Sequence, residues 1–404
     1  MIVFVDYLYK EIGGVGQLVV NTVLALNQRN EIAKIYCSGD SYEYKQLKSL
    51  GASFTFINSD EVSLKQLPDF LDNTDVILLT HINNTPLLEQ LKNKGIRILF
   101  YSVHPDTFFV YNRYMKVFAQ KSAALQLVSL LLSKKALVFM DTPNVEGVNR
   151  RGGKLCTKEM EYLPIPIHST KKISRIMHQP NGISITYIGR GNADWKVYPI
   201  VRVVKDLQKI AKDITLTIIT DKTELFEAMI KKAVPENHLN ITYKTGLSGE
   251  SLSNYLAENS DLHISMGTSA LEGARLGVPT ILIDYSYNQF PDNYLYRWLF
   301  ECKGFCLAED ITNVSSFEGY TIDEIINSIS DSSKYMELSL ACYDYVQKNH
   351  SADNYIIKLI DYCENTHMTV NDYCRTRFSF NMKWVNSVVV KLSNYKNKLL
   401  RKNS

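Results

Sequence analysis

The stretch His263–Asp284, HISMGTSALEGARLGVPTILID, holds a strand, a helix and a second strand in one short segment. Its first run, HISM, is short and apolar, SALEGARLG has helical composition, and PTILID is a second short apolar run. Two such runs joined by one helix predict parallel strands with a right-handed crossover. The expected architecture is therefore a parallel sheet covered by helices.

The same rhythm extends outward from this stretch in both directions. Segments with helical spacing separate the other apolar runs, so we predict an α/β chain of two doubly wound, Rossmann-like domains. At 404 residues the chain also exceeds the roughly 250–300 residues that one core usually serves. The expected strands include residues 2–8, 33–38, 53–58, 75–81, 97–104, 136–143, 184–190, 215–220 and 240–246.

Prolines and polar residues without clear periodicity follow the first set of strands and suit a linker. We expect a first domain over residues 1–165, a linker over 166–180 and a second domain over 181–365. Residues 366–404 form the expected helical tail.

Composition and charge exclude several classes of protein. The formal net charge is only +3, and basic and acidic residues are mixed, so nucleic acid is not the expected partner. The seven cysteines are scattered and never form a CxxC pair, which indicates reduced thiols rather than a metal site.

The first apolar run reaches Asp6 without a preceding basic region, which favours a buried strand over a signal peptide. No apolar run reaches the roughly 18 residues of a spanning helix. We expect a cytoplasmic protein. The tail interleaves apolar and basic residues, so it either contacts an anionic membrane peripherally or packs as a solvated final helix.

Gly13, Gly14 and Gly16 lie between the first expected strand and a helix. Glycine permits close backbone approach, and the free amides at a helix start favour an anion. The alternative is a tight turn without a ligand. The spacing GGVG also differs from the GxGxxG pattern of dinucleotide sites.

A second loop, YIGRGNADWKVYP, carries Gly189, Arg190 and Lys196. The Arg190 guanidinium can bind a phosphate through two parallel hydrogen bonds, and Lys196 adds a compact positive charge. Together they can neutralise a diphosphate. The alternative is a pair of solvated surface cations.

The opening stretch supplies the third candidate site. Gly267, Thr268 and Ser269 begin its helix, where amides and hydroxyls can contact phosphate oxygens. Glu272 follows and can accept hydrogen bonds from ribose hydroxyls. Alternatively, Glu272 only stabilises the start of its own helix.

In this order the three motifs resemble those of GT-B glycosyltransferases, especially the retaining branch that builds bacterial surface glycans. The resemblance spans nearly the whole chain and includes an E-x4-G-x-P pattern at Glu272, Gly277 and Pro279. It implies two domains that face each other across a cleft, with acceptor binding in the first and donor binding in the second.

The resemblance also implies an activity, a metal-independent glycosyltransferase of the hexosyltransferase type without a cofactor. Its partners would be a nucleotide diphosphate sugar and a glycan or lipid-linked acceptor, in surface polysaccharide synthesis at the inner face of the membrane. Arg190 and Lys196 would hold the diphosphate and Glu272 the ribose. The amides around Thr268 and Ser269 would contact phosphate.

Two positions depart from the family pattern. An earlier glutamate of the family would fall at Ile264, and the spacing from Arg190 to Lys196 is one residue longer. Retention and inversion at the anomeric carbon both stay open.

His81 and His104 lie at the ends of expected strands in the first domain, where ligands of doubly wound sheets bind. The family often has a histidine near the transferred sugar at the position of His104. If the reaction inverts, His104 or Asp106 is the candidate base. Either histidine can instead be structural.

Two other functions remain open on the sequence. A nucleotide-sugar epimerase of the same fold would use carboxylates around the sugar ring. A catalytically inactive GT-B scaffold or regulatory subunit would explain the missing glutamate, although Arg190, Lys196 and Glu272 are all present.

Overall fold

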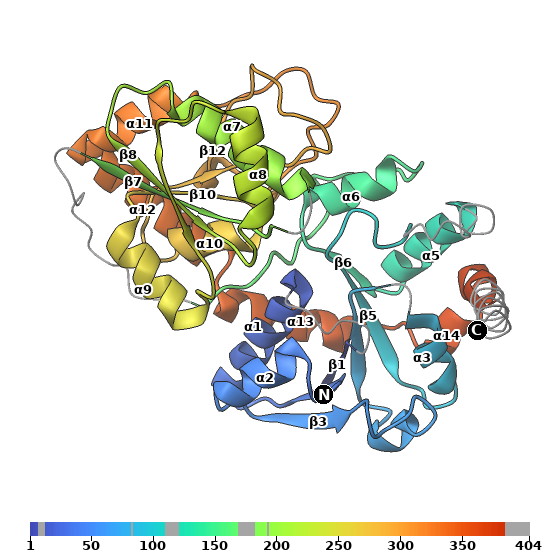
Figure 1. Ribbon diagram of the computed structural model, residues 1–404. Coiled ribbons are helices and arrows are strands. Elements are labelled where there is room, and N and C mark those ends of the chain that lie inside the picture. The colour runs from blue at the N-terminus through green and yellow to red at the C-terminus, as the bar shows by residue number, and fades with distance from the viewer. Residues whose placement is uncertain (7–12, 82–83, 110–120, 169–181, 192–193, 384–404) are drawn as a thin grey trace, which may run out of the picture. The chain divides into compact units, whose positions relative to one another are not determined.

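The computed structural model describes residues 1–6, 13–81, 84–109, 121–168, 182–191 and 194–383. The chain divides into two compact units (Figure 1). Unit 1 consists of Met1–Pro166 and Ala352–Ser404, and unit 2 of Ile167–Ser351.

Unit 1 is built on a parallel sheet with the strand order β3-β2-β1-β4-β5-β6. Most of these strands are buried apolar runs, as expected for strands covered by helices on both faces. The strands are β1 (Ile2–Asp6), β2 (Ala33–Cys37), β3 (Phe54–Asn58), β4 (Val76–Leu79), β5 (Arg97–Ser102) and β6 (Leu137–Phe139). The helices are α1 (Gly14–Gln28), α2 (Tyr42–Ser49), α3 (Thr85–Gln90), α5 (Lys121–Ser133), α6 (Thr142–Asn149), α13 (Ala352–Asn365) and α14 (Val370–Cys374), with a 3-10 turn over Leu67–Phe70.

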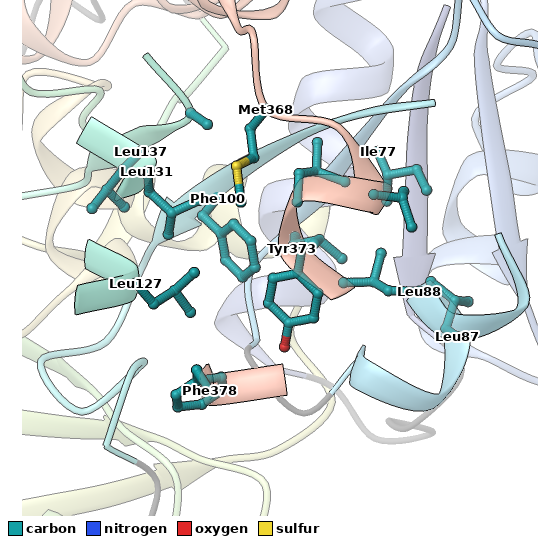
Figure 2. Packing of buried hydrophobic residues seen from close by; sticks show 14 of the residues in the cluster. Ile77, Leu87, Leu88, Phe100, Leu127, Leu131, Leu137, Met368, Tyr373 and Phe378 are labelled. Atoms are coloured by element: carbon teal, nitrogen blue, oxygen red, sulfur yellow. The ribbon is translucent and has the colours of Figure 1, made fainter. Parts of the chain in front are cut away.

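Alternating side chains of this sheet build two cores. Ile2 and Phe4 of β1 pack on the side of α1 and α13, whereas Val3 packs on the side of α3, α5 and α14. Figure 2 shows the second core, where Phe100 of β5 lies beside Tyr373 of α14 with ring centroids 5.9 Å apart. The buried apolar residues of α5, which include Leu127 and Leu131, face this core.

Unit 2 repeats the design with the strand order β12-β11-β10-β7-β8-β9. All neighbouring strands are parallel except β12, which runs antiparallel to β11. The strands are β7 (Ile183–Ile188), β8 (Ile214–Ile219), β9 (Asn240–Lys244), β10 (Leu262–Ser265), β11 (Thr280–Leu282) and β12 (Arg297–Trp298). The helices are α7 (Asp194–Leu207), α8 (Glu224–Ala233), α9 (Gly249–Asn259), α10 (Thr268–Ala274), α11 (Ile322–Ser330) and α12 (Ser332–Asn349), with a 3-10 turn over Leu299–Glu301.

The division of the chain differs from the expected one at α13, for which the sequence predicts a place in the second domain. Its apolar stripe, which includes Ile356 and Leu359, packs in the core beside α1 of unit 1. Tyr355 adds a polar contact, since its hydroxyl accepts a hydrogen bond from Thr22 of α1 at 3.3 Å. Helical periodicity predicts the stripe but not which of two similar sheets it covers.

Two other expectations fall wholly or partly on residues that the structure does not describe. Most of the expected linker over 166–180 lies outside the described residues, as does the basic end of the tail from residue 384. Within the described ranges, no helix combines the length and the apolar content needed to cross a membrane.

The assignment of α13 to unit 1 predicts unequal effects of two neighbouring substitutions. Ile356 is fully buried and Ile357 is 52% exposed. Replacing Ile356 by alanine should lower the free energy of unfolding by about 2–5 kcal/mol, whereas Ile357→Ala should change it by less than about 0.5 kcal/mol. Urea denaturation of the full chain measures both values, and equal effects would contradict this packing.

Candidate functional site

The loop after β7 is held in place at the carboxyl end of the unit 2 sheet. The amide of Gly189 donates to the carbonyl of Ile219 at 3.1 Å, and the amide of Gly191 donates to the carboxylate of Asp221 at 2.8 Å. The surroundings of both glycines leave no room for a side chain. A methyl group would come 2.6 Å from the Tyr187 ring at Gly189 and 2.3 Å from the carbonyl oxygen of Lys222 at Gly191.

This loop and the first turn of α7 bring two positive charges near each other. Burial and, to a smaller extent, the positive charge of Arg190 lower the pKa of Lys196 to about 8, although Asp221 acts in the opposite direction. The Nζ atom of Lys196 lies 4.9 Å from the centroid of the Trp195 ring. A half-buried ammonium beside a guanidinium creates a local positive potential that suits an anion.

The start of α10 lies at the same edge of the sheet. β10 and β7 are neighbours, Ser265 is paired with Ile188, and the Ser265 hydroxyl donates to the Ile188 carbonyl at 2.9 Å. Gly267 follows with a φ of 59°, a left-handed value that favours glycine, and Thr268 and Ser269 begin the helix. Two of the predicted loops therefore leave neighbouring strands at one end of the sheet.

Glu272 lies on α10, and its carboxylate is held by a neighbouring cation. Nε of Arg275 donates to Oε2 of Glu272 at 2.7 Å, and Nη2 of Arg275 donates to the Ser253 hydroxyl at 2.7 Å. The Glu272 side chain keeps 22% of its surface exposed. Arg275 thus fixes this partly accessible carboxylate from one side.

His263 supports this region, and no local sequence pattern indicates that role. Its ring is fully buried in β10, with Nδ1 3.2 Å from the Thr186 carbonyl oxygen and Nε2 2.9 Å from that of Ser269. Burial lowers the pKa of His263 to about 4, so the ring stays neutral near pH 7. Gly273 leaves room for it, since a methyl group there would come 2.7 Å from the ring.

Trp195, whose ring lies beside the Lys196 ammonium, packs against two tyrosine rings that the sequence motifs do not include. The ring centroid of Trp195 is 5.4 Å from that of Tyr285 and 5.9 Å from that of Tyr287. Both tyrosines follow Asp284, whose carboxylate accepts from the Arg297 guanidinium at 2.6 Å. The rings come from segments about 90 residues apart, so no local sequence pattern could have revealed the cluster.

In unit 1 the structure brings the two predicted histidines near each other. His81 and His104 follow β4 and β5, which are neighbouring strands with Leu79 paired to Phe100. The pKa of His81 is lowered by burial and, to a smaller extent, by the positive charge of His104. The pair therefore lies at the carboxyl end of the unit 1 sheet.

Asp106 has a partner that the sequence did not reveal. Its carboxylate forms an ion pair with Arg151, whose guanidinium also lies 4.8 Å from the Phe109 ring centroid. The amide of Asp106 donates to Nδ1 of His104 at 3.1 Å. Asp106 is therefore engaged with both Arg151 and His104.

The three glycines of the first motif mark the start of α1. Gly13 occupies the N-cap position with an extended backbone, Gly14 is the first helical residue, and Gly16 is buried in the first turn. The negative φ of Gly13 shows that this turn does not need glycine for a left-handed conformation. Position 16 requires glycine because α2 packs against it and leaves no room for a larger side chain.

No protein-family profile and no curated protein matches the sequence. Solved structures do match. A glycosyltransferase from Rickettsia africae ESF-5 superposes with a TM-score of 0.58 and 14% identity, over 91% of this chain and 98% of that one. Anabaena HepE in complex with UDP superposes with a TM-score of 0.59 and 11% identity, over 90% of this chain and 99% of that one. A Staphylococcus aureus TarM variant in complex with fondaparinux, alpha-GlcNAc-glycerol and UDP superposes with a TM-score of 0.59 and 9% identity, over 90% of this chain and 99% of that one.

The chain has the GT-B fold. The predicted fold class is confirmed, with two Rossmann-like sheets followed by C-terminal helices. At these identities the likeness establishes the fold alone, and function must be argued from the site.

The two cations of unit 2 generate a measurable prediction. NMR titration of the full chain should give Lys196 a pKa near 8, and Arg190→Gln should raise that pKa because a repelling charge is removed. Lys231 on α8 is exposed and serves as an internal control. A pKa near 10.5 for Lys196 in both proteins would show that the two charges do not interact.

Proposed function

We propose that this GT-B chain is a glycosyltransferase that moves a sugar from a nucleotide diphosphate sugar to a glycan or lipid-linked acceptor. The observation that carries the proposal is the pair of cations at the carboxyl end of β7, Arg190 and half-buried Lys196. Ligands of doubly wound sheets bind at this end of the strands, and a diphosphate is an anion that a guanidinium and an ammonium can bind together.

In this proposal each group of unit 2 contacts one part of the donor. Arg190 and Lys196 bind the diphosphate, and the amides around Gly267, Thr268 and Ser269 contact its oxygens. Glu272 accepts hydrogen bonds from the ribose hydroxyls. Gly189 lets the loop pass close to the Tyr187 ring, which keeps Arg190 at the sheet edge.

The structural neighbours support a nucleotide diphosphate as the donor's leaving group. HepE has been crystallised with UDP and with UDP-glucose, and WaaB is described as a lipopolysaccharide outer core galactosyltransferase. These are properties of those proteins. We extend them to this chain as the proposal of hexosyl transfer in bacterial surface polysaccharide synthesis, on the cytoplasmic side and with peripheral contact to the inner membrane.

The chemistry requires the bond between the anomeric carbon and the diphosphate oxygen to break while the acceptor hydroxyl forms the new glycosidic bond. Arg190 and Lys196 stabilise the charge that develops on the departing diphosphate without a metal ion. The acceptor proton needs a base, either the leaving phosphate or a side chain. His104 suits this role better than Asp106, because the Asp106 carboxylate is neutralised by Arg151.

Thermal-shift measurements with nucleoside diphosphates and nucleotide sugars test the donor site. The matching nucleotide should raise the melting temperature of the wild type, because a ligand that binds only the native state stabilises it by mass action. Glu272→Ala should weaken the affinity about tenfold or more, in line with about 1.5–3 kcal/mol for a hydrogen bond to a charged group. Product analysis with that donor then separates transfer or hydrolysis from epimerisation.

The matched control is Glu258→Ala, which removes an exposed carboxylate from α9 in the same unit. Its nucleotide affinity should equal that of the wild type. Two results would contradict the proposed donor site. One is that no nucleotide raises the melting temperature of the wild type, and the other is that Glu272→Ala and Glu258→Ala bind the nucleotide with equal affinity.

A further inference from the structure

A hollow of about 510 Å³ lies on unit 2 between α7 and α8. The two helices lie side by side (Figure 1), and residues 289–292 of the loop after β11 add a third wall. Pockets for small molecules commonly enclose about 300–1,000 Å³. The hollow therefore has the size of a small-molecule site, and its described lining includes no residue of the proposed donor site.

The inner wall of the hollow is apolar. Val201 of α7 is only 8% exposed, and Leu225, Met229 and Phe290 are partly buried against the unit 2 core. Leu225 and Met229 lie about one helical turn apart on α8, so they share a face of that helix. An alkyl chain placed here would leave water for an apolar surface, which is favourable.

The third wall is held in place by Arg202, whose side chain is 8% exposed. Its Nη1 atom donates to the carbonyl of Pro291 at 2.9 Å, and Nη2 donates to that of Asp292 at 3.0 Å. Nε donates to the Asp206 carboxylate at 2.7 Å, so a buried anion already balances the guanidinium. The hollow is thus formed without a ligand, which lowers the ordering cost of binding.

Two lysines from different helices bring positive charge to the hollow. Lys205 of α7 and Lys232 of α8 both line it, and neither forms an ion pair with another described residue. Asp292 is the acidic residue of the described lining, and its carboxylate lies 3.5 Å from Arg202. A complementary ligand therefore combines an apolar chain with an anionic group.

The exposure of apolar side chains decides between a membrane and a free molecule as the source of this ligand. Helices that lie on a bilayer surface bury an apolar face in it. In the described parts of α7, α8 and residues 289–292, no large apolar side chain is strongly exposed. The apolar surface lies inside the hollow, so the ligand enters it as a single molecule.

We infer that this hollow binds a free single-chain anionic amphiphile of the fatty-acid class. The alkyl chain packs against Val201, Leu225 and Met229. The carboxylate pairs with Lys205 and Lys232. This gives the chain a second ligand site, which does not depend on the proposed function because the two sites share no described residue.

Titration calorimetry on the full chain tests the inference, with decanoate as the probe below its micelle-forming concentration. Decanoate should bind with one molecule per chain. Acetate keeps the carboxylate but lacks the alkyl chain, so it should not bind measurably. Decanol lacks the charge and should bind about tenfold more weakly than decanoate, because it forms neither ion pair.

Met229→Glu places a negative charge inside the hollow and should abolish decanoate binding. Its matched control is Ala228→Glu, which adds the same charge at an exposed neighbouring position of α8 that does not line the hollow. The control should bind decanoate like the wild type.

Lys205→Gln/Lys232→Gln should lower the affinity for decanoate about tenfold and leave that for decanol unchanged. Lys231→Gln removes an exposed lysine beside Lys232 that does not line the hollow, and it should change neither affinity.

Four results would overturn the inference. The first is that the wild type does not bind decanoate. The second is that Met229→Glu and Ala228→Glu bind it equally, and the third is that the double lysine variant and Lys231→Gln do so. The fourth is binding to phosphatidylglycerol vesicles that Met229→Glu abolishes, since this would assign the hollow to a membrane lipid instead.

Discussion

The repulsion between two positive charges at the end of β7 is the constraint on which the proposed site depends. Lys196 is half buried, and its ammonium feels both the loss of water and the charge of Arg190, which lowers its pKa to about 8. An arrangement that disfavours the charged form of a lysine costs stability in the unliganded protein. A bound diphosphate stabilises the charged form of Lys196 beside Arg190. The same arrangement of cations therefore favours binding of the donor.

The rest of unit 2 holds these charges where they are. Asp221 fixes the loop through the amide of Gly191, and the Ser265 hydroxyl ties β10 to β7. His263 contacts the carbonyl oxygens of Thr186 and Ser269, which secures the start of α10 beside the same strand. Hydrogen bonds of this kind fix the backbone around a binding site, so that its charged groups stay in place before a ligand binds.

Local patterns in the sequence were sufficient to predict the sheets and the position of the unit 2 loops. Short apolar runs separated by single helices determine parallel sheets, and glycines between a strand and a helix mark the turns. The Arg151 partner of Asp106 and the rings around Trp195 depend on contacts between distant segments, which periodicity does not report. For the same reason, periodicity predicts the helix α13 but not that it packs in unit 1.

The affinities of UDP and uridine, measured by titration calorimetry on the wild type and on Arg190→Gln/Lys196→Gln, test the central claim most directly. The difference between the two ligands isolates the contribution of the diphosphate. The account predicts that UDP binds the wild type at least about a hundredfold more tightly than uridine, as two charge-assisted contacts imply, and that the double variant loses most of this difference. An unchanged preference for UDP in the double variant would contradict it.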